Sequence, residues 1–246
     1  LTFLSNFDVI NIQKFCYGRD AMSQNITWSV SIEEQFYLFW PLIFAFLPKR
    51  LWIYSISLVI IGSILFRIIN NNDGIVLYFH TFSVLLDLGI GGLMALLIKS
   101  NKKFRNYFEN CSTLTHLTFF IFAFCLVFWG GILFSFNYGS AISRIFISFS
   151  FALIITAQAI TKRESKFNLG NMSFANKWGK YTYGIYLIHP IAITIIDVIV
   201  RLMHFPKTNF INLFSIGAIC FILTLFLSKI SFRYYELRFL SLKDKF

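Results

Sequence analysis

Long apolar stretches separated by short polar connections dominate the chain. A helix needs about 20 mostly apolar residues to cross a bilayer, so each stretch of this length predicts a membrane-spanning helix. Seven stretches reach it: Trp28–Leu47, Leu51–Ile69, Phe79–Ile98, Leu114–Phe134, Ser140–Ile160, Tyr181–Val200 and Phe210–Ile230. We therefore predict an all-α membrane protein, a bundle of about seven transmembrane helices.

Composition supports this class over a water-soluble one. Of the 246 residues, 57% are hydrophobic and 13% are charged, whereas a soluble domain carries roughly 25% charged residues. Phenylalanine alone occupies 32 positions, more than one globular core could bury. A hydrocarbon solvent removes the difficulty, because apolar surface is favourable there.

The basic residues are distributed unevenly between the two sets of alternating loops. One set holds 16 of the 22 lysines and arginines and the opposite set holds 3. This bias predicts that residues 1–27 form an extracytoplasmic segment and that residues 231–246 form a cytoplasmic C-terminal tail. The net charge of +11 lies in short loops rather than on one soluble face, so we expect no nucleic-acid partner. The richer loops are Pro48–Arg50, Lys99–Arg105, Thr161–Lys180 and Lys229–Lys245.

Cysteine and histidine spacing predicts neither a metal site nor a disulfide framework. The four cysteines are far apart, with no CxxC pair and no cluster of histidines near them. We interpret them as packing residues: Cys16, Cys111, Cys125 and Cys220.

The densest polar segment lies at the outer end of the first predicted helix. Its residues divide into two faces at helical spacing, one with Ser29, Glu33 and Tyr37 and one with Ser31 and Gln35, with Glu34 between them. One interpretation is a capped helix start at the interface, since carboxylates near a helix N-terminus are stabilising and Trp28 suits an aromatic belt. The alternative is the wall of a wet, protein-lined cavity.

Three ionisable residues lie inside other spans, where such residues are costly and therefore functional candidates. His189 precedes Pro190, which frees a backbone carbonyl one turn earlier. Its role stays open between a structural hydrogen bond, proton transfer, and contact with substrate or donor. Asp87 needs a partner within the bundle, and we expect that partner to be Arg67.

The segment Trp-Ser-Val-Ser-Ile-Glu-Glu-Gln-Phe-Tyr-Leu-Phe-Trp-Pro at Trp28–Pro41 closely resembles the hallmark segment of the acyltransferase 3 family. Three further segments are similar to the family and follow in its order: His80–Leu97, Gly179–Pro190 and Phe232–Leu240. The last departs from the usual pattern, because Leu237 and Arg238 stand where the family has Lys-Pro. That departure weakens any specific role for Glu236.

The resemblance implies a multi-pass enzyme of the bacterial inner membrane, an O-acetyltransferase acting on a polysaccharide or lipopolysaccharide sugar. Its expected partners are the lipid bilayer, an acyl-CoA donor (acetyl-CoA first) and a carbohydrate acceptor, with no bound cofactor. It further implies that residues 1–246 are a partial domain lacking the family's first three helices. A histidine and an arginine of the family would be lost with them, so we expect this chain alone to lack the catalytic base.

Site roles follow from combining the polar residues with the resemblance. The expected catalytic residues are Glu33, Glu34 and His189, with Glu33 favoured over Glu34 because it shares a face with Ser29 and Tyr37. The expected substrate-binding residues are Trp28, Ser29, Ser31, Gln35, Tyr37, Arg67, His80, Asp87, Tyr186 and Glu236. Two other readings stay open: a transporter or flippase-like bundle whose buried ionisable groups form a proton or solute path, and a degenerate pseudo-enzyme.

Overall fold

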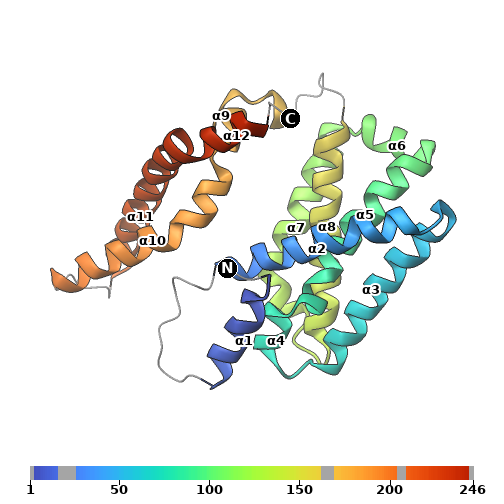
Figure 1. Cartoon of the computed structure of the whole chain (residues 1–246), viewed down its shortest axis with the longest axis horizontal. Coiled ribbons are helices and arrows are strands. Elements are labelled where there is room, and N and C mark those ends of the chain that lie inside the picture. The colour runs from blue at the N-terminus through green and yellow to red at the C-terminus, as the bar shows by residue number, and fades with distance from the viewer. Residues whose placement is uncertain (1–2, 16–25, 162–168, 204–208, 244–246) are drawn as a thin grey trace. The chain divides into compact units, whose positions relative to one another are not determined.

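The computed structural model describes residues 3–15, 26–161, 169–203 and 209–243 (Figure 1). These residues are almost entirely helical and contain no strand. The chain forms two compact units, which are described separately. The first comprises Leu1–Asp20 and Thr27–Met172, and the second comprises Ala21–Ile26 and Ser173–Phe246.

Six helical stretches are long and apolar enough to cross a membrane among the described residues. Most of their side chains lie outside the interior of the structure, as expected for helices that face hydrocarbon. The prediction of an all-α, multi-pass membrane protein is therefore confirmed. The six stretches are Lys49–Ile69, Gly74–Ser100, Thr113–Leu133, Gly139–Ile160, Thr182–Leu202 and Ile211–Leu242.

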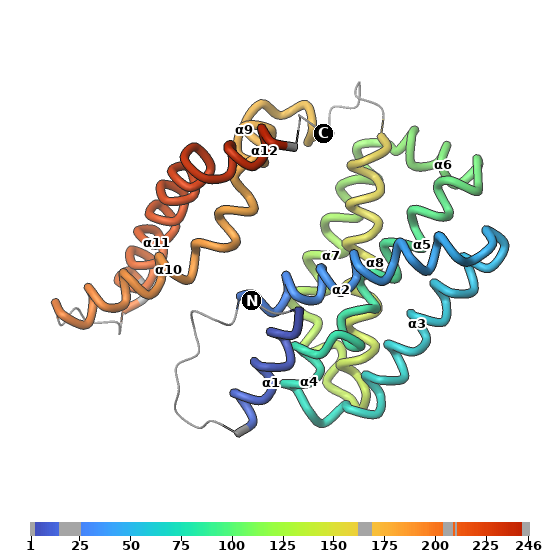
Figure 2. The backbone as a smooth tube through the Cα atoms, viewed as in Figure 1, coloured from blue at the N-terminus to red at the C-terminus, as the bar shows by residue number. Residues whose placement is uncertain are grey.

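The seventh predicted helix forms, but it is not among the six. This helix, α2 (Thr27–Phe46), contains Glu33, Glu34 and Gln35 in its first half, and these residues lower its hydropathy below that of a spanning helix. In Figures 1 and 2, α2 runs across the direction of α7 and α8. The described residues thus hold six stretches that are apolar enough to span a membrane and, in α2, a seventh long helix whose first half is polar.

The first unit is organised around α5 (Thr81–Ser100), which packs against both α3 (Trp52–Ile69) and α8 (Gly139–Ile160). α7 (Thr113–Leu133) packs on the other side of α8. Buried apolar residues of α5 and α8, joined by Phe108 from α6 (Lys102–Glu109), form the largest core cluster: Leu86, Ile90, Met94, Phe108, Cys111, Ala152 and Ala157. α5 is therefore the element on which the polar groups described below converge.

The ends of these helices are set by local chemistry. The Asp73 side chain caps α4 (Gly74–Phe79), accepting from the Val76 amide, and Ser112 caps α7 in the same way. Between α7 and α8, Tyr138 adopts a positive φ of 63°. A Cβ on the next residue, Gly139, would come within 1.9 Å of the Phe134 carbonyl oxygen, so this turn requires glycine.

Part of the predicted N-terminal segment is a helix that belongs to the first unit. α1 (Ser5–Phe15) contacts α2 and α4 and buries Asn6, Val9 and Ile10. Residues 16–25 of the predicted segment, which include Cys16, lie outside the described residues. So do residues 162–168, which carry part of the basic loop used to orient the chain, and the orientation therefore stays a prediction.

The second unit is built on two long helices, α10 (Thr182–Leu202) and α11 (Phe210–Ser231), which lie side by side (Figure 2). α9 (Ser173–Gly179) precedes them. After α11 the chain makes a π-helical turn, η3 (Phe232–Glu236), and continues as α12 (Leu237–Lys243). The described part of the predicted tail is thus helical.

Candidate functional site

The polar segment of α2 places its two faces in different surroundings. The Ser31 and Gln35 face is turned toward the first unit, because Ser31 is buried and Gln35 is half-buried. Glu33, Glu34 and Tyr37 are exposed, and neither glutamate has a hydrogen bond or ion pair with another described residue. Within this unit, the face that is packed is therefore not the one that carries the expected catalytic carboxylates.

Gln35 belongs to a closed set of neutral hydrogen bonds, the amide cluster, formed by Asn6, Gln35 and Thr81. The fully buried Asn6 donates through Nδ2 to Thr81 Oγ1 at 3.0 Å and to the Phe79 carbonyl at 3.2 Å. Gln35 Nε2 donates to Asn6 Oδ1 at 3.1 Å, and Thr81 Oγ1 donates to Gln35 Oε1 at 2.6 Å. The cluster ties α1 and α2 to the junction between α4 and α5. Ser31 adds a 2.5 Å hydroxyl contact with Ser5 of α1.

His80 lies beside this cluster at the start of α5. Its Nδ1 accepts from the Phe82 amide at 3.2 Å, so the neutral ring carries its proton on Nε2. The ring stacks on Phe66 at 4.5 Å and meets the edge of Phe7 at 5.0 Å. Trp28 packs on the same region, with its ring centroid 5.2 Å from that of Phe79.

A cavity of 310 Å³ brings two of the predicted residues, Gln35 and His80, to one wall. Thr81 is its third polar group, and the rest of the lining is aromatic or aliphatic: Phe7, Phe36, Phe39, Trp40, Ile43, Val59, Phe82 and Leu85. An apolar pocket with a few convergent polar groups is the usual form of a small-molecule site. This cavity is the candidate ligand site of the first unit.

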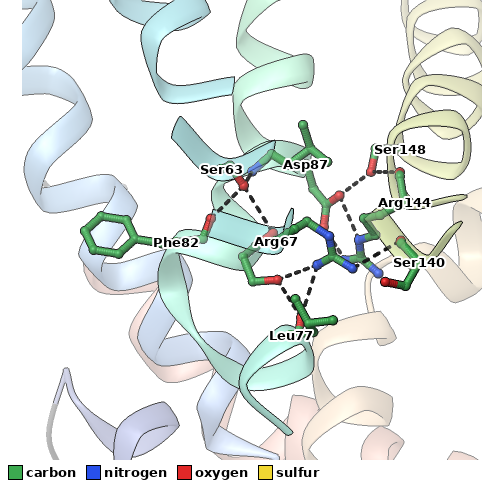
Figure 3. Close-up of polar contacts among 10 residues, drawn as sticks. Ser63, Arg67, Leu77, Phe82, Asp87, Ser140, Arg144 and Ser148 are labelled. Atoms are coloured by element: carbon green, nitrogen blue, oxygen red, sulfur yellow. Dashed lines mark hydrogen bonds and ion pairs between the residues drawn. The ribbon is translucent and has the colours of Figure 1, made fainter. Parts of the chain in front are cut away.

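A second polar group, the arginine cluster of Arg67, Asp87 and Arg144, corrects the expected pairing of Asp87 (Figure 3). Asp87 forms its ion pair with Arg144 of α8, whose Nε lies 3.1 Å from Oδ1 and whose Nη2 contacts Oδ2. Ser148, one turn along α8, donates to the same carboxylate. The pairing with Arg67 was wrong because α5 is flanked by two helices, α3 and α8, and each carries an arginine close to the first half of α5.

Arg67 instead bonds only neutral oxygen atoms. It is 7% exposed, its Nη1 donates to the Leu77 carbonyl at 3.1 Å and to Ser83 Oγ, and its Nη2 donates to the Ser140 carbonyl at 3.5 Å. Figure 3 shows its guanidinium beside that of Arg144. Arg67 therefore joins α3, α4, α5 and α8 but has no carboxylate of its own.

In the second unit, the surroundings of His189 determine which of its ring nitrogens carries the proton in the neutral form. Pro190 has no amide hydrogen, so the Tyr186 carbonyl loses its helical partner. The half-buried His189 takes up that carbonyl, with Nδ1 2.7 Å from the oxygen. Because a carbonyl only accepts, Nδ1 must donate, and the neutral ring keeps its lone pair on Nε2. Tyr186 also donates through its hydroxyl to the Ile26 carbonyl at 3.3 Å.

Glu236 lies on the π-helical turn and faces α10. A Cβ on the buried Gly184 would stand 3.0 Å from Glu236 Oε1, so the absence of a side chain there admits the carboxylate. π turns are frequent at functional positions. Of the residues predicted in this unit, the structure places His189 with Tyr186 and places Glu236 against Gly184.

His116 of α7 is a buried histidine that sequence reasoning did not single out. Its Nδ1 lies 3.3 Å from Gln158 Nε2, and its Nε2 lies 3.2 Å from Thr161 Oγ1. Both ring nitrogens are thus occupied, which indicates a structural role. The described residues contain no group of acidic, cysteine and histidine side chains that could hold a metal ion.

These features define a polytopic, all-α membrane protein with polar clusters and a small apolar cavity among its helices. A family model described as an acyltransferase domain matches residues 13–231. The chain belongs to this family, the acyltransferase 3 family. Neither the comparison with curated proteins nor that with solved structures gave a match.

Proposed function

We propose that this chain is a membrane O-acyltransferase that transfers an acyl group, in the first place acetyl, from acyl-CoA to a hydroxyl of a cell-surface polysaccharide or lipopolysaccharide sugar. The observation that carries the proposal is the family match over residues 13–231. Multi-pass architecture supports it, since a donor made in the cytoplasm must reach an acceptor assembled outside. A bacterial inner membrane is the location proposed with it.

The family resemblance implied a base outside this chain; in its place we propose His189 as the general base. Its Nε2 lone pair would take the proton of the acceptor hydroxyl while the hydroxyl oxygen attacks the thioester carbonyl carbon. The carbon–sulfur bond then breaks, and the proton on Nε2 passes to the leaving thiolate. The hydrogen bond from Nδ1 to the Tyr186 carbonyl supports this role because it orients the ring and stabilises the protonated form.

The other predicted residues are proposed as binding groups around this reaction. Glu33 and Glu34 are exposed carboxylates, suited to accept hydrogen bonds from sugar hydroxyls. His80, which lines the 310 Å³ cavity, offers its Nε2 donor to a ligand oxygen. Gln35 lines the same cavity, but its amide donates to Asn6 and to the Phe3 carbonyl, so we propose that it shapes the site. We propose that the aromatic remainder of this cavity holds the apolar part of the ligand.

The experiment compares O-acetylation of the surface glycan in a deletion strain and in strains that carry single variants. His189→Asn keeps an amide donor for the Tyr186 carbonyl and removes the base, so acetylation should fall by about 100-fold or more. Thr194→Ala is the matched control, because among the described residues its hydroxyl bonds only the Pro190 carbonyl on the same helix. This control should retain full acetylation.

Two outcomes would distinguish a failure of the proposed enzymatic activity from a failure of the proposed roles of Glu33 and Glu34. Unchanged acetylation in the deletion strain would contradict the enzyme and favour a transporter or flippase. Full acetylation with Glu33→Gln and with Glu34→Gln would reject the acidic residues alone and leave the reaction in place.

A further inference from the structure

A second cavity of the first unit, the α5–α8 groove, runs along two packed helices. It encloses 500 Å³, and its polar residues are Asp87, Arg144, Ser148 and Thr156. The remaining lining is small or apolar, for example Gly91, Ala95 and Ile98 on α5 and Ala152, Ile155 and Ala159 on α8. A groove of this form suits a narrow, chain-like ligand better than a sugar ring.

The polar end of the groove lies near the middle of the membrane-spanning stretch Gly74–Ser100. There the Arg144 side chain is 38% exposed and uses Nε and Nη2 for its bonds to Asp87. In the part of the chain that the structure describes, its Nη1 donates to no protein atom. Because Asp87 already balances the charge of Arg144, this end offers a hydrogen-bond donor that suits a neutral acceptor such as a carbonyl oxygen.

The opposite end of the groove lies where the span ends, and basic side chains gather there. Ile98, the last groove residue of α5, is followed directly by the exposed Lys99. α6 packs against both α5 and α8 and begins with the exposed Lys102 and Lys103. None of the three lysines forms an ion pair with another described residue. This end therefore presents positive charge at the membrane boundary, on the side that the basic loops predict to be cytoplasmic.

The distance between the two ends can be compared with the length of a coenzyme A thioester. At 1.5 Å per helical residue, Asp87 and Ile98 stand roughly 16 Å apart. The pantetheine arm, between the phosphates and the sulfur, contains about as many chain bonds as four extended residues, which span roughly 14 Å. The thioester carbonyl and the phosphates lie just beyond the ends of this arm. A thioester carbonyl at Arg144 would therefore leave the phosphates near the lysines.

We propose that the α5–α8 groove binds the pantetheine arm of the acyl-CoA donor, with the thioester carbonyl on Arg144 Nη1 and the phosphates on the lysines beyond Ile98. This inference rests on the proposed function, which supplies the donor, and it assigns the donor a site. A lipid with its headgroup on the same lysines would end its hydrocarbon chain on the Asp87–Arg144 ion pair, where it gains no hydrogen bond. A thioester carbonyl gains one, and a guanidinium stabilises the negative charge that develops on this oxygen during acyl transfer.

The first experiment measures thermal unfolding of the purified protein in detergent with added acetyl-CoA, which should raise Tm because it binds the folded state. Gly91 lines the groove, and a Cβ there would meet nothing within 4 Å. Gly91→Leu therefore fills the groove without a clash and should abolish the shift. Gly131→Leu on α7, where a Cβ also meets open space, is the matched control and should keep it. An acetyl-CoA shift kept by Gly91→Leu, or a phosphatidylglycerol shift that only Gly91→Leu loses, would overturn the assignment.

Two further comparisons test the ends of the groove separately. Lys99→Gln, Lys102→Gln and Lys103→Gln combined should weaken acetyl-CoA binding about 10-fold and leave S-acetylpantetheine, which has no phosphate, unchanged. Asp87→Asn combined with Arg144→Gln removes the ion pair without stranding either partner. This double variant should lose a preference for acetyl-CoA over free CoA that is roughly 10-fold in the unmodified protein. Loss of S-acetylpantetheine binding in the lysine variant, or a preference kept by the double variant, would contradict the placement of that end.

Surface O-acetylation separates a failure of this site from a failure of the proposed function. Unchanged acetylation in the deletion strain would overturn both, because the donor itself would then have no role. If the deletion strain loses acetylation but Gly91→Leu restores it fully and binds acetyl-CoA as the unmodified protein does, the groove assignment alone is rejected. The expected result is that Gly131→Leu restores acetylation and Gly91→Leu does not.

Discussion

The amide cluster and the arginine cluster both pack on the N-terminal half of α5, yet they satisfy their polar groups differently. In the amide cluster, Asn6, Gln35 and Thr81 bond one another and nearby carbonyls. In the arginine cluster, Asp87 pairs with Arg144 alone, and Arg67 bonds only neutral oxygen atoms and keeps an Nε without a hydrogen-bond partner among the described residues. Neutral groups can complete one another within a small cluster, whereas charges must also balance, and here they do not.

The largest effect should come from removing the shared carboxylate. Asp87→Asn leaves two guanidiniums without a counter-charge, and breaking a buried ion pair in this way costs about 3–5 kcal/mol. Because the pair is partly exposed, the lower end of that range is expected. Equilibrium unfolding in detergent measures the change. Asp87→Asn with Arg144→Gln should cost less than Asp87→Asn alone, and the opposite order would contradict a charge-based role.

A smaller effect should follow from opening the amide cluster. Asn6→Ala removes the donor to Phe79 and Thr81 and the acceptor for Gln35, and unsatisfied buried polar groups cost about 1–3 kcal/mol. The same unfolding measurement applies. Asn106→Ala, at an exposed position of α6, is the control and should change stability little. A loss no larger than that of the control would show that the amide cluster is not needed to hold α1.

The smallest effect concerns a partly exposed pair outside both clusters, Lys14 and Asp73, which joins α1 to the start of α4. Hydrogen bonds from Lys14 and from the Val76 amide lower the pKa of Asp73 below its ordinary 3.8. The stabilisation is therefore fully present above that ordinary value and is lost as the pH falls through the lower, folded-state pKa. Exposure limits it to roughly 0–1 kcal/mol.

Thermal unfolding of the unmodified protein and of Lys14→Gln, measured from about pH 6 to about pH 2, would give this contribution. That range extends on both sides of the pKa of an ordinary aspartate carboxyl. The two proteins should converge at the acid end of the range. A difference that grows on acidification would contradict the sign derived from the Asp73 pKa.

Hydrophobic stretch length predicted the helices well, because the bilayer imposes one length on each of them. Both ends of Thr113–Leu133 and of Gly139–Ile160 lie within one residue of their expected bounds. α2 was the exception, since Glu33, Glu34 and Gln35 make its first half polar. The sequence showed that polarity, but apolar length alone did not decide between a spanning and an oblique helix.

Partners were much harder to predict than helices. Asp87 required a cation, but the choice between Arg67 and Arg144 depended on how α3 and α8 pack against α5. Asn6 carried no signal at all, because a single asparagine in a mixed segment is common, and its burial depends on α1 folding onto α2 and α4. For His189, the sequence predicted the carbonyl freed by Pro190 but not that His189 itself would bond to it.

The π-helical turn between α11 and α12 makes the orientation of Glu236 depend on chain length. A π turn holds one residue more than an α turn, so the helix after it is rotated by about 100° relative to an uninterrupted continuation. Deleting one codon within residues 232–235 would leave a continuous helix but turn the Glu236 carboxylate away from Gly184, against which it now lies. A one-residue insertion or deletion in this turn would therefore remove the contact between Glu236 and Gly184 by redirecting the side chain, although the glutamate itself is kept.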